Sequence, residues 1–331
     1  MRNLKRKVGV IIVNLGTPDA PEAGALRRYL REFLGDPRVV EAPRWLWWLA
    51  LNLVILRIRP AKSARNYRKI WTAQGSPLMH YTCALTEKIA ARLNADYGER
   101  VVVKAAMRYG NPHFTEALSA LHQQGVERLL VLPLFPQYSG STTGSIYDCL
   151  GAQLRHWRYI PHVHVIGDYY VDDEYIAALA HSVKQRWERQ GMRPSKLLFS
   201  FHGIPQRYVD KGDPYAKQCL ATAEAVASAL GLASDQWCTA FQSRFGREQW
   251  LKPYTSEVLT AWAKQGVESV SVICPGFAVD CLETIEEIGE ENAHLFLSNG
   301  GKTFDYIPAL NDDLTHVSAL TNLVSRSINE W

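Results

Sequence analysis

Eight short apolar runs, separated by amphipathic stretches of helix length, constrain the fold of this chain most strongly. The runs lie at residues 9–16, 100–109, 127–135, 162–169, 196–203, 237–245, 269–277 and 304–310. Most are continuous β-branched or leucine-rich segments, which is typical of parallel strands covered by helices on both faces. The helix-length stretches include residues 114–124, 173–190, 215–230, 254–265 and 313–328. This alternation predicts a doubly wound α/β fold.

An internal repeat divides the eight runs into two sets of four. The tripeptide Gly-Val-Glu opens the third run at 125–127 and opens the seventh run at 266–268. The first run ends in Leu-Gly-Thr-Pro at 15–18, and the fifth ends in His-Gly-Ile-Pro at 202–205. Two matches in the same order indicate duplication of one unit. We therefore predict two similar Rossmann-like domains, each a four-stranded parallel sheet flanked by helices, with the active site in the crevice between them.

The two predicted domains differ in size. We place the first at residues 1–172 and the second at 173–312, and we expect the helix at 313–331 to pack back on the first domain. Gly16 and Gly125 are 109 residues apart, whereas the equivalent Gly203 and Gly266 are 63 apart. The first domain therefore carries an insertion, which we place at about residues 36–80.

The inserted segment contains an apolar stretch at residues 43–60. Its apolar core, residues 45–56, is shorter than the ~20 residues that span a bilayer. Tryptophan and leucine flanked by arginine are typical of a segment that lies in a membrane interface. A buried helix of the first domain and an apolar lip over a flat hydrophobic ligand are the alternatives.

Composition and short motifs exclude several classes of protein. Lys+Arg exceed Asp+Glu by 37 to 33, an excess too small to indicate nucleic-acid binding. The six cysteines form no C-x-x-C pair, which favours reduced thiols in a cytoplasm. The basic N-terminus precedes only a short apolar run, which we interpret as a strand and not as a signal peptide. Without a G-x-G-x-x-G motif, a dinucleotide cofactor is not expected.

Two groups of reactive side chains follow the ends of predicted strands, where parallel α/β sheets bind ligands. His202 ends the fifth run and is held there by a Gly-Ile-Pro turn. After the seventh run, Glu283, Glu287 and Glu291 recur every four residues and would form a carboxylate stripe on a helix. An imidazole facing a carboxylate forms a labile site for a divalent metal or an acid/base pair. The alternatives are a turn histidine, a solvated acidic face, and a capping box between Asp280 and Glu283.

Several segments together resemble the ferrochelatase family, whose members insert Fe²⁺ into protoporphyrin IX, and the resemblance is greatest to the form of enteric-type bacteria. The segments are VNLGTP (13–18), GSPLMHYT (75–82), MRYGNP (107–112), LFPQYSGSTTGS (134–145), SFHGIPQRYVDKGDPY (200–215), FQSRFGREQWLKPYT (241–255) and CPGFAVDCLETIEEI (274–288). The resemblance implies a chelatase-type fold and a lyase of haem biosynthesis.

The resemblance also implies roles for individual residues. His202 and Glu283 match the pair that flanks the porphyrin centre, where His202 would act as general base and Glu283 would aid deprotonation or hold the metal. Glu287 and Glu291 match an acidic row taken as a metal path or proton exit. Leu15 matches a substrate-binding position that faces the other side of the macrocycle, and Arg108, Tyr109 and Phe277 match residues that line the substrate cleft.

The resemblance further implies protoporphyrin IX and Fe²⁺ as substrates, no permanently bound cofactor and no nucleic-acid partner. A [2Fe–2S] cluster of the animal type is not expected, because Gly140 replaces one cysteine ligand and the chain ends at Trp331. Cys281 follows Asp280 where some members have histidine, and we assign it no role. We expect a cytoplasmic protein with a peripheral membrane contact through residues 43–60. A chelatase for another tetrapyrrole, such as coproporphyrin or a cobalt-accepting precursor, and a non-catalytic haem or metal carrier remain alternatives.

Overall fold

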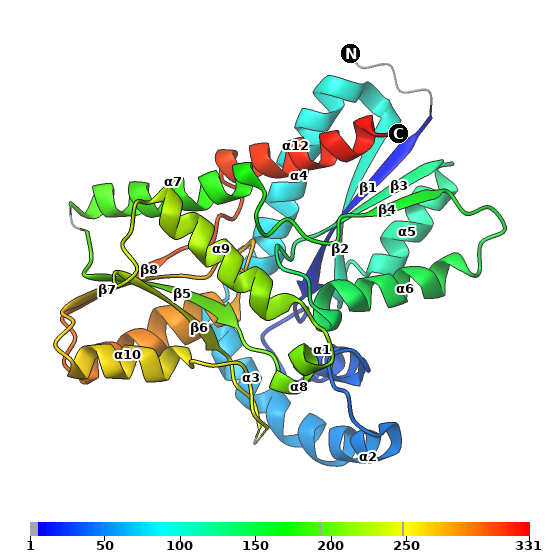
Figure 1. Cartoon of the computed structure of the whole chain (residues 1–331). Helices are drawn as coiled ribbons and strands as arrows, with labels where there is room; N and C mark the ends of the chain where they lie inside the picture. The colour runs from blue at the N-terminus through cyan, green and yellow to red at the C-terminus, as the bar shows by residue number, and fades with distance from the viewer. Residues whose placement is uncertain (1–5, 192, 247) are drawn as a thin grey trace. The chain divides into compact units, whose positions relative to one another are not determined.

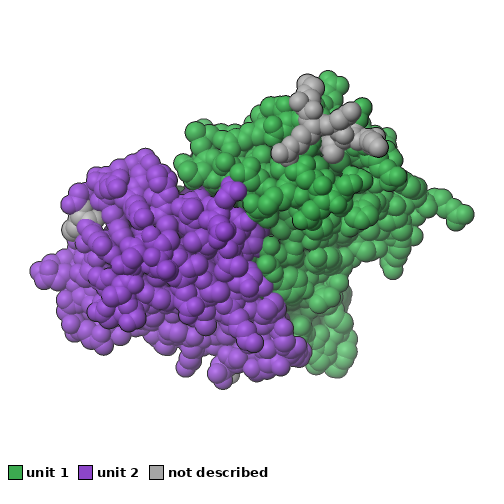
Figure 2. All heavy atoms as spheres, turned by 45° about the horizontal axis from the view of Figure 1, so that its top comes forward, with its two compact units in different colours: residues 1–168, 312–331 green, residues 169–311 purple. Residues whose placement is uncertain are grey.

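The computed structural model describes residues 6–191, 193–246 and 248–331 (Figure 1). Residues 1–5 of the basic N-terminus, Met192 and Arg247 of the matched 241–255 segment lie outside the described residues. The chain divides into two compact units (Figure 2), residues 1–168 with 312–331 and residues 169–311. The boundaries therefore fall within four residues of the predicted divisions at 172/173 and 312/313.

Unit 1 is built on a parallel sheet of four strands in the order β2-β1-β3-β4. The strands are β1 (Val8–Gly16), β2 (Val101–Tyr109), β3 (Arg128–Pro133) and β4 (His162–Val165). The helices α1 (Ala23–Gly35), α4 (Pro77–Tyr97), α5 (Phe114–Gln123) and α6 (Ser145–Leu154) belong to the same unit. Every residue of β1 except Leu15 is buried, as the continuous apolar run predicts.

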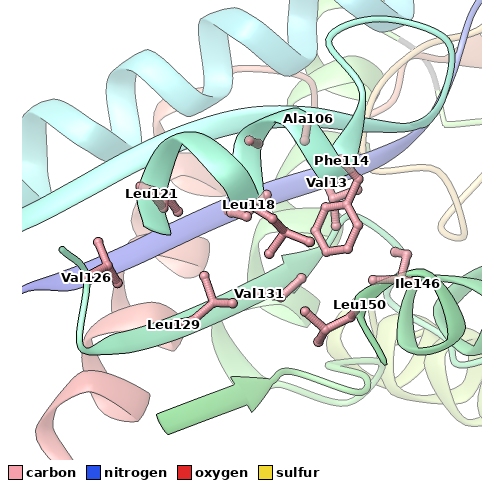
Figure 3. Packing of buried hydrophobic residues seen from close by; sticks show 12 residues of the cluster. Val13, Ala106, Phe114, Leu118, Leu121, Val126, Leu129, Val131, Ile146 and Leu150 are labelled. Carbon is pink, nitrogen blue, oxygen red and sulfur yellow. The ribbon is translucent and has the colours of Figure 1, made fainter. Parts of the chain in front are cut away.

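The core of unit 1 forms where α5 and α6 pack on the sheet. Figure 3 shows Phe114 of α5 beside Val13 of β1 and Leu121 of α5 near Val126, in one buried cluster that also contains Leu118 and Val131. The C-terminal helix α12 (Leu314–Asn329) packs against α4 and β3 in this unit. Hydrogen bonds anchor both of its ends, because Lys88 reaches Asp312 at 2.6 Å and Arg128 reaches the carbonyl of Trp331 at 2.5 Å.

Unit 2 repeats this topology with the strand order β6-β5-β7-β8. Its strands are β5 (Lys196–His202), β6 (Trp237–Gln242), β7 (Ser269–Ile273) and β8 (Thr303–Ile307). Its helices are α7 (Asp173–Gln190), α8 (Gln206–Asp210), α9 (Tyr215–Ala229), α10 (Thr255–Lys264), the π-helix η4 (Glu283–Asn292) and α11 (Ala293–Ser298). Two four-stranded parallel sheets flanked by helices confirm the predicted fold class.

The duplication extends to details of the backbone. In unit 1 the N–H of Met107 donates to the carbonyl of Pro112 at 2.7 Å, and in unit 2 the N–H of Phe241 donates to that of Pro253 at 2.9 Å. A π-helix also follows the third strand of each copy, η3 (Gly140–Gly144) in unit 1 and η4 in unit 2. The two copies can therefore be compared residue by residue.

The predicted insertion lies between α1 and α4. It forms a nearly continuous helical segment of α2 (Arg44–Leu49), the π-helix η1 (Ala50–Ile55) and α3 (Leu56–Ile70). No residue of α2 is buried, while Leu51 and Leu56 farther along the segment are. A buried helix therefore accounts for only part of this segment.

Candidate active site

His202 ends β5 and is, with Lys196 at the other end, one of the two residues of that strand that are not fully buried. Its Nδ1 lies 2.6 Å from the carbonyl oxygen of Gly203. Because a carbonyl only accepts hydrogen bonds, Nδ1 carries a proton, so that when the ring is neutral its lone pair lies on Nε2. The rings of Trp250 and Phe277 lie 6.3 and 6.5 Å from the imidazole, between ring centroids. His202 is therefore a fixed imidazole with one free basic nitrogen.

The turn after His202 leaves little room for a larger residue. A Cβ atom on Gly203 would lie 3.0 Å from the carbonyl oxygen of Gln242 and 3.1 Å from Trp250. The N–H of Gly203 donates to that same carbonyl at 2.8 Å, which continues the pairing of β5 with β6 for one residue. The glycine in the matched sequence thus sets the exit of the chain from the strand.

Glu283 is the first residue of η4, the helix that follows β7. Its backbone carbonyl accepts a hydrogen bond of 2.8 Å from the side-chain amide of Gln242. Burial first, and then the charge of Glu283, raise the pKa of the Cys281 thiol well above its usual range. The thiol therefore stays protonated and serves as a hydrogen-bond partner of the Glu283 carboxyl group.

Glu287 lies one turn farther along the same π-helix. Its Oε1 accepts a hydrogen bond of 2.7 Å from the N–H of Ser243, and its Oε2 accepts one from the Ser243 hydroxyl. Burial raises the pKa of Glu287, although the bonds from Ser243 and the charge of His202 act against it. The charge of Glu283 raises the pKa further. The structure therefore brings His202 and Glu283 each within electrostatic range of Glu287, whereas Glu291 is exposed to solvent.

The spacing predicts that the acidic residues form a stripe on an α-helix. The structure differs, because η4 is a π-helix with i→i+5 hydrogen bonds. π-Helical turns occur frequently at functional sites. In the part of the chain that the structure describes, no three His, Cys, Asp or Glu side chains gather in a way that could hold a metal ion. A divalent cation would meet at most a sparse set of donors here.

Asp280 anchors the start of η4, and the alternative of a capping box is wrong. Its carboxylate accepts hydrogen bonds from the hydroxyls of Thr284 (2.9 Å) and Tyr306 (2.5 Å) and from the side-chain amide of Asn311 (2.7 Å). These partners come from η4 itself, from β8 and from the loop after β8. Asp280 therefore fixes the position of the helix that bears Glu283.

The predicted substrate residues of unit 1 occupy different environments. Leu15 is partly exposed at the end of β1, at the position that His202 takes in β5. Arg108 donates to Asp36 at 2.6 Å and to the hydroxyl of Ser145 at 2.7 Å. Tyr109 is fully buried, and its hydroxyl donates to the same Asp36 at 2.9 Å. Arg108 and Tyr109 thus stabilise unit 1, and their contact with a substrate stays a prediction.

Phe277 lies in unit 2, where it is partly buried and packs against the hydrophobic core. Its ring is also one of the two aromatic neighbours of His202. Sequence reasoning missed Gln242 and Ser243 as parts of this site, because each acts through hydrogen bonds to residues far along the chain, and it considered Asp280 only as a helix cap. The left-handed turn that follows β6 gave no signal in the sequence.

Comparison with solved structures defines the class of this fold. SirB from Bacillus subtilis with Fe³⁺ superposes with a TM-score of 0.60 at 12% identity, covering 97% of this chain and 96% of SirB. CbiX, the terminal enzyme for biosynthesis of siroheme in denitrifying bacteria, gives a TM-score of 0.53 at 14% identity, covering 96% of this chain and 99% of CbiX. The fold is that of the metal chelatases.

Sequence comparison narrows the class. The family model described as Ferrochelatase matches residues 7–328. The ferrochelatase of Pseudoalteromonas atlantica is 52% identical over 325 residues, which cover 98% of this chain and 90% of that protein. The ferrochelatase of Alcanivorax borkumensis is 52% identical over 323 residues, covering 98% of this chain and 94% of that protein. The chain belongs to the ferrochelatase family, whose members are metal chelatases, which confirms the resemblance inferred from its motifs.

Proposed function

We propose that this chain inserts Fe²⁺ into protoporphyrin IX to form protohaem, with His202 and Glu283 at the reacting centre. Membership of the ferrochelatase family supports the reaction. The hydrogen bond from Nδ1 of His202 to Gly203 carries the assignment of the base, because it leaves Nε2 free to accept a proton. The carboxylate partner comes from η4, which follows the neighbouring strand β7.

The reaction exchanges two protons for one metal ion. The two inner N–H groups of the free porphyrin must each lose a proton as Fe²⁺ forms bonds to the four pyrrole nitrogens. Nε2 of His202 accepts the first proton, and the resulting imidazolium is stabilised by the carboxylates of Glu283 and Glu287. Glu283 or water accepts the second proton. The porphyrin thus loses two positive charges as protons and gains two as Fe²⁺.

Weak binding of the metal suits this exchange. A cation held by four protein ligands in a closed site would not be released to the porphyrin. One imidazole and one or two carboxylates hold it loosely enough for transfer. We assign Glu287 and Glu291 to the route along which the metal arrives or the protons leave. Contacts around the rim of the porphyrin would bend the macrocycle and expose its nitrogen lone pairs.

An anaerobic insertion assay with protoporphyrin IX and Fe²⁺ or Zn²⁺ tests these roles. We expect His202→Ala and Glu283→Gln each to lower kcat at least 100-fold, which is typical of the loss of an acid–base group. The exposed residues His294 and Glu257 in the same unit provide matched controls, His294→Ala and Glu257→Gln. Near-normal insertion by either site variant would remove its assigned role.

The same assay separates the alternative functions. Faster turnover of coproporphyrin than of protoporphyrin would indicate another tetrapyrrole substrate. A carrier would bind haem and give no more than one product per chain. The absence of a [2Fe–2S] cluster stays a prediction, which iron and sulfide analysis of the purified protein would test.

We also propose that the inserted helices of unit 1 rest on the cytoplasmic surface of a membrane. Trp45, Trp48 and Ile58 are 68%, 59% and 70% exposed, which is unusual for side chains of this size. Arg44, Arg57 and further arginines nearby suit an anionic lipid surface. Along the described ranges, no helix combines the length and the apolar character needed to cross a bilayer. A peripheral contact accounts for this combination.

Co-sedimentation with lipid vesicles tests the membrane contact. We expect binding to vesicles with anionic lipid, weaker binding to zwitterionic vesicles, and loss of binding in Trp48→Glu. Tyr159 is similarly exposed elsewhere in unit 1, so Tyr159→Glu is the control. If Trp48→Glu binds vesicles normally but has a higher KM for porphyrin, the segment is a lip over the substrate instead.

A further inference from the structure

Ser243, the residue after β6, has an unusual backbone conformation. Its φ is +63°, and within the described ranges Asn311 is the only other residue besides glycine with a positive φ. Glycine adopts this left-handed region without a steric penalty, whereas serine does not. The shared hydrogen bonds align Met107 with Phe241, so Ser243 corresponds to Tyr109, and Gly110, with a φ of +80°, comes one residue later. Unit 2 thus adopts the left-handed conformation at a residue that carries a polar side chain, and such an outlier suggests a function for that side chain.

The side chain and backbone of Ser243 hold one carboxylate. The N–H donates to Oε1 of Glu287 at 2.7 Å, and the hydroxyl donates to Oε2 of the same residue. Two donors on two oxygens prevent the carboxylate from turning about its terminal bond. Each oxygen has a second lone pair, so the group can still accept a metal ion or a proton.

Gln242 links this arrangement to the neighbouring strand β5 and to η4. It lies opposite His202 in the pairing of β5 with β6. Its side-chain oxygen accepts a hydrogen bond of 2.7 Å from Ser200, and its amide donates to the carbonyl of Glu283 at 2.8 Å. The amide also lies 3.5 Å from Oε2 of Glu287. The backbone that presents Ser243 to Glu287 is therefore tied to both His202 and Glu283.

We infer that Ser243 is a positioning residue for metal insertion, which holds the Glu287 carboxylate in one orientation beside His202 so that it receives the incoming metal ion. This inference rests on the proposed function. It assigns Ser243 an effect on the metal and not on the porphyrin, because its two hydrogen bonds go to a carboxylate of the acidic row. Loss of the hydroxyl should therefore raise the KM for Fe²⁺ or Zn²⁺ about ten-fold, with the KM for porphyrin changed less than two-fold.

Two substitutions separate the hydroxyl from the backbone. Ser243→Ala removes the hydroxyl and keeps the strained φ, whereas Ser243→Gly removes the hydroxyl and relieves the strain. If the hydroxyl positions Glu287, both variants show the higher KM for metal, and Ser243→Gly melts no lower than the unmodified protein. If Ser243→Gly has normal kinetics, the side chain has no such role and the inference is overturned. Ser195→Ala, at the opposite end of β5 and exposed, is the matched control.

A double-mutant cycle with Glu287→Gln completes the test. We expect Glu287→Gln alone to raise the KM for metal, and Ser243→Ala to add less than two-fold in that background, because the two residues act through one contact. Independent, multiplying effects would overturn the inference, and so would normal kinetics of Glu287→Gln. If the Ser243 variants are normal while His202→Ala and Glu283→Gln are inactive, the inference fails and the proposed function stands. If His202→Ala and Glu283→Gln insert metal normally, the proposed function itself fails.

Discussion

Asp36 is the residue whose removal should destabilise unit 1 most clearly. Its side chain is 6% exposed and that of Arg108, its ion-pair partner, is 14% exposed. It accepts hydrogen bonds from Arg108 (2.6 Å), from the hydroxyls of Tyr109 (2.9 Å) and Ser145 (2.6 Å), and from the N–H of Arg38 (2.8 Å). Asp36→Ala leaves a guanidinium and two hydroxyls buried without their shared acceptor.

The expected loss follows from this burial. Breaking a buried ion pair by removing one partner costs about 3–5 kcal/mol, because the remaining charge is left uncompensated. The Arg108–Asp36 pair is far less exposed than surface ion pairs, which contribute about 0–1 kcal/mol. We therefore expect Asp36→Ala to lower the free energy of unfolding of unit 1 by about 3–5 kcal/mol.

Urea unfolding, followed by hydrogen exchange of amides in β1 and β3, measures this loss within unit 1 alone. The control is Asp19→Ala, which breaks an ion pair with Arg28 whose side chains are 42% and 66% exposed. We expect that control to lose no more than about 1 kcal/mol. The double variant Asp36→Ala/Arg108→Met should lose less than the sum of the single variants, because it removes both charges. Equal losses in Asp36→Ala and Asp19→Ala, or additive single effects, would refute the reasoning.

Two further predictions concern ionisable groups. Burial raises the pKa of Glu32, but hydrogen bonds from His113 and from the N–H of Gly110 outweigh it, so that the net shift of this pKa is downward. The ionised Glu32 then stabilises the fold above the pKa that this residue has in the unfolded chain, and the stabilisation is lost as the pH falls through the lower pKa of Glu32 in the folded protein. The difference in unfolding free energy between the unmodified protein and Glu32→Gln should shrink below about pH 4.5 in acid titrations, and a constant difference would contradict this. Burial also raises the pKa of Cys281 well above the usual range, so mass spectrometry after brief alkylation should find Cys149, which is half-buried, modified before Cys281.

The fold was predictable because the inner strands β1, β3, β5 and β7 are buried along nearly their whole length. Apolar runs mark all eight strands, and the repeat marks their grouping into two sheets. The ends of the strands were less predictable. The run at 237–245 continues past the end of β6 at Gln242, because the left-handed φ of Ser243 turns the chain out of the strand. That turn depends on Glu287, a residue 44 positions away, which local sequence cannot reveal.

The candidate site was predictable where chemistry and strand ends coincide. His202 and Glu283 stand out because few reactive side chains follow the strands. The residues that hold them were not predictable, because Gln242, Ser243 and Asp280 act through hydrogen bonds between β6, η4 and β8. The spacing of the glutamates also fits an α-helix and a π-helix about equally well, so the sequence alone predicted the commoner of the two.

The two copies of the repeated unit differ in the residues at the ends of their strands. Leu15 occupies in unit 1 the position of His202 in unit 2. Thr142 occupies the position of Glu283, because the two residues are as far apart in the chain as Gly125 and Gly266 of the repeat. Asp36 ties the second strand of unit 1 to the start of α6 through Arg108 and Ser145, so the strand ends there are locked by a satisfied polar network. In unit 2 the equivalent strand ends carry a free imidazole nitrogen and a carboxylate with spare lone pairs. Of the two copies of the fold, one thus carries the apolar insertion and a satisfied polar network, while the other carries the polar groups to which we assign the exchange of protons for a metal ion.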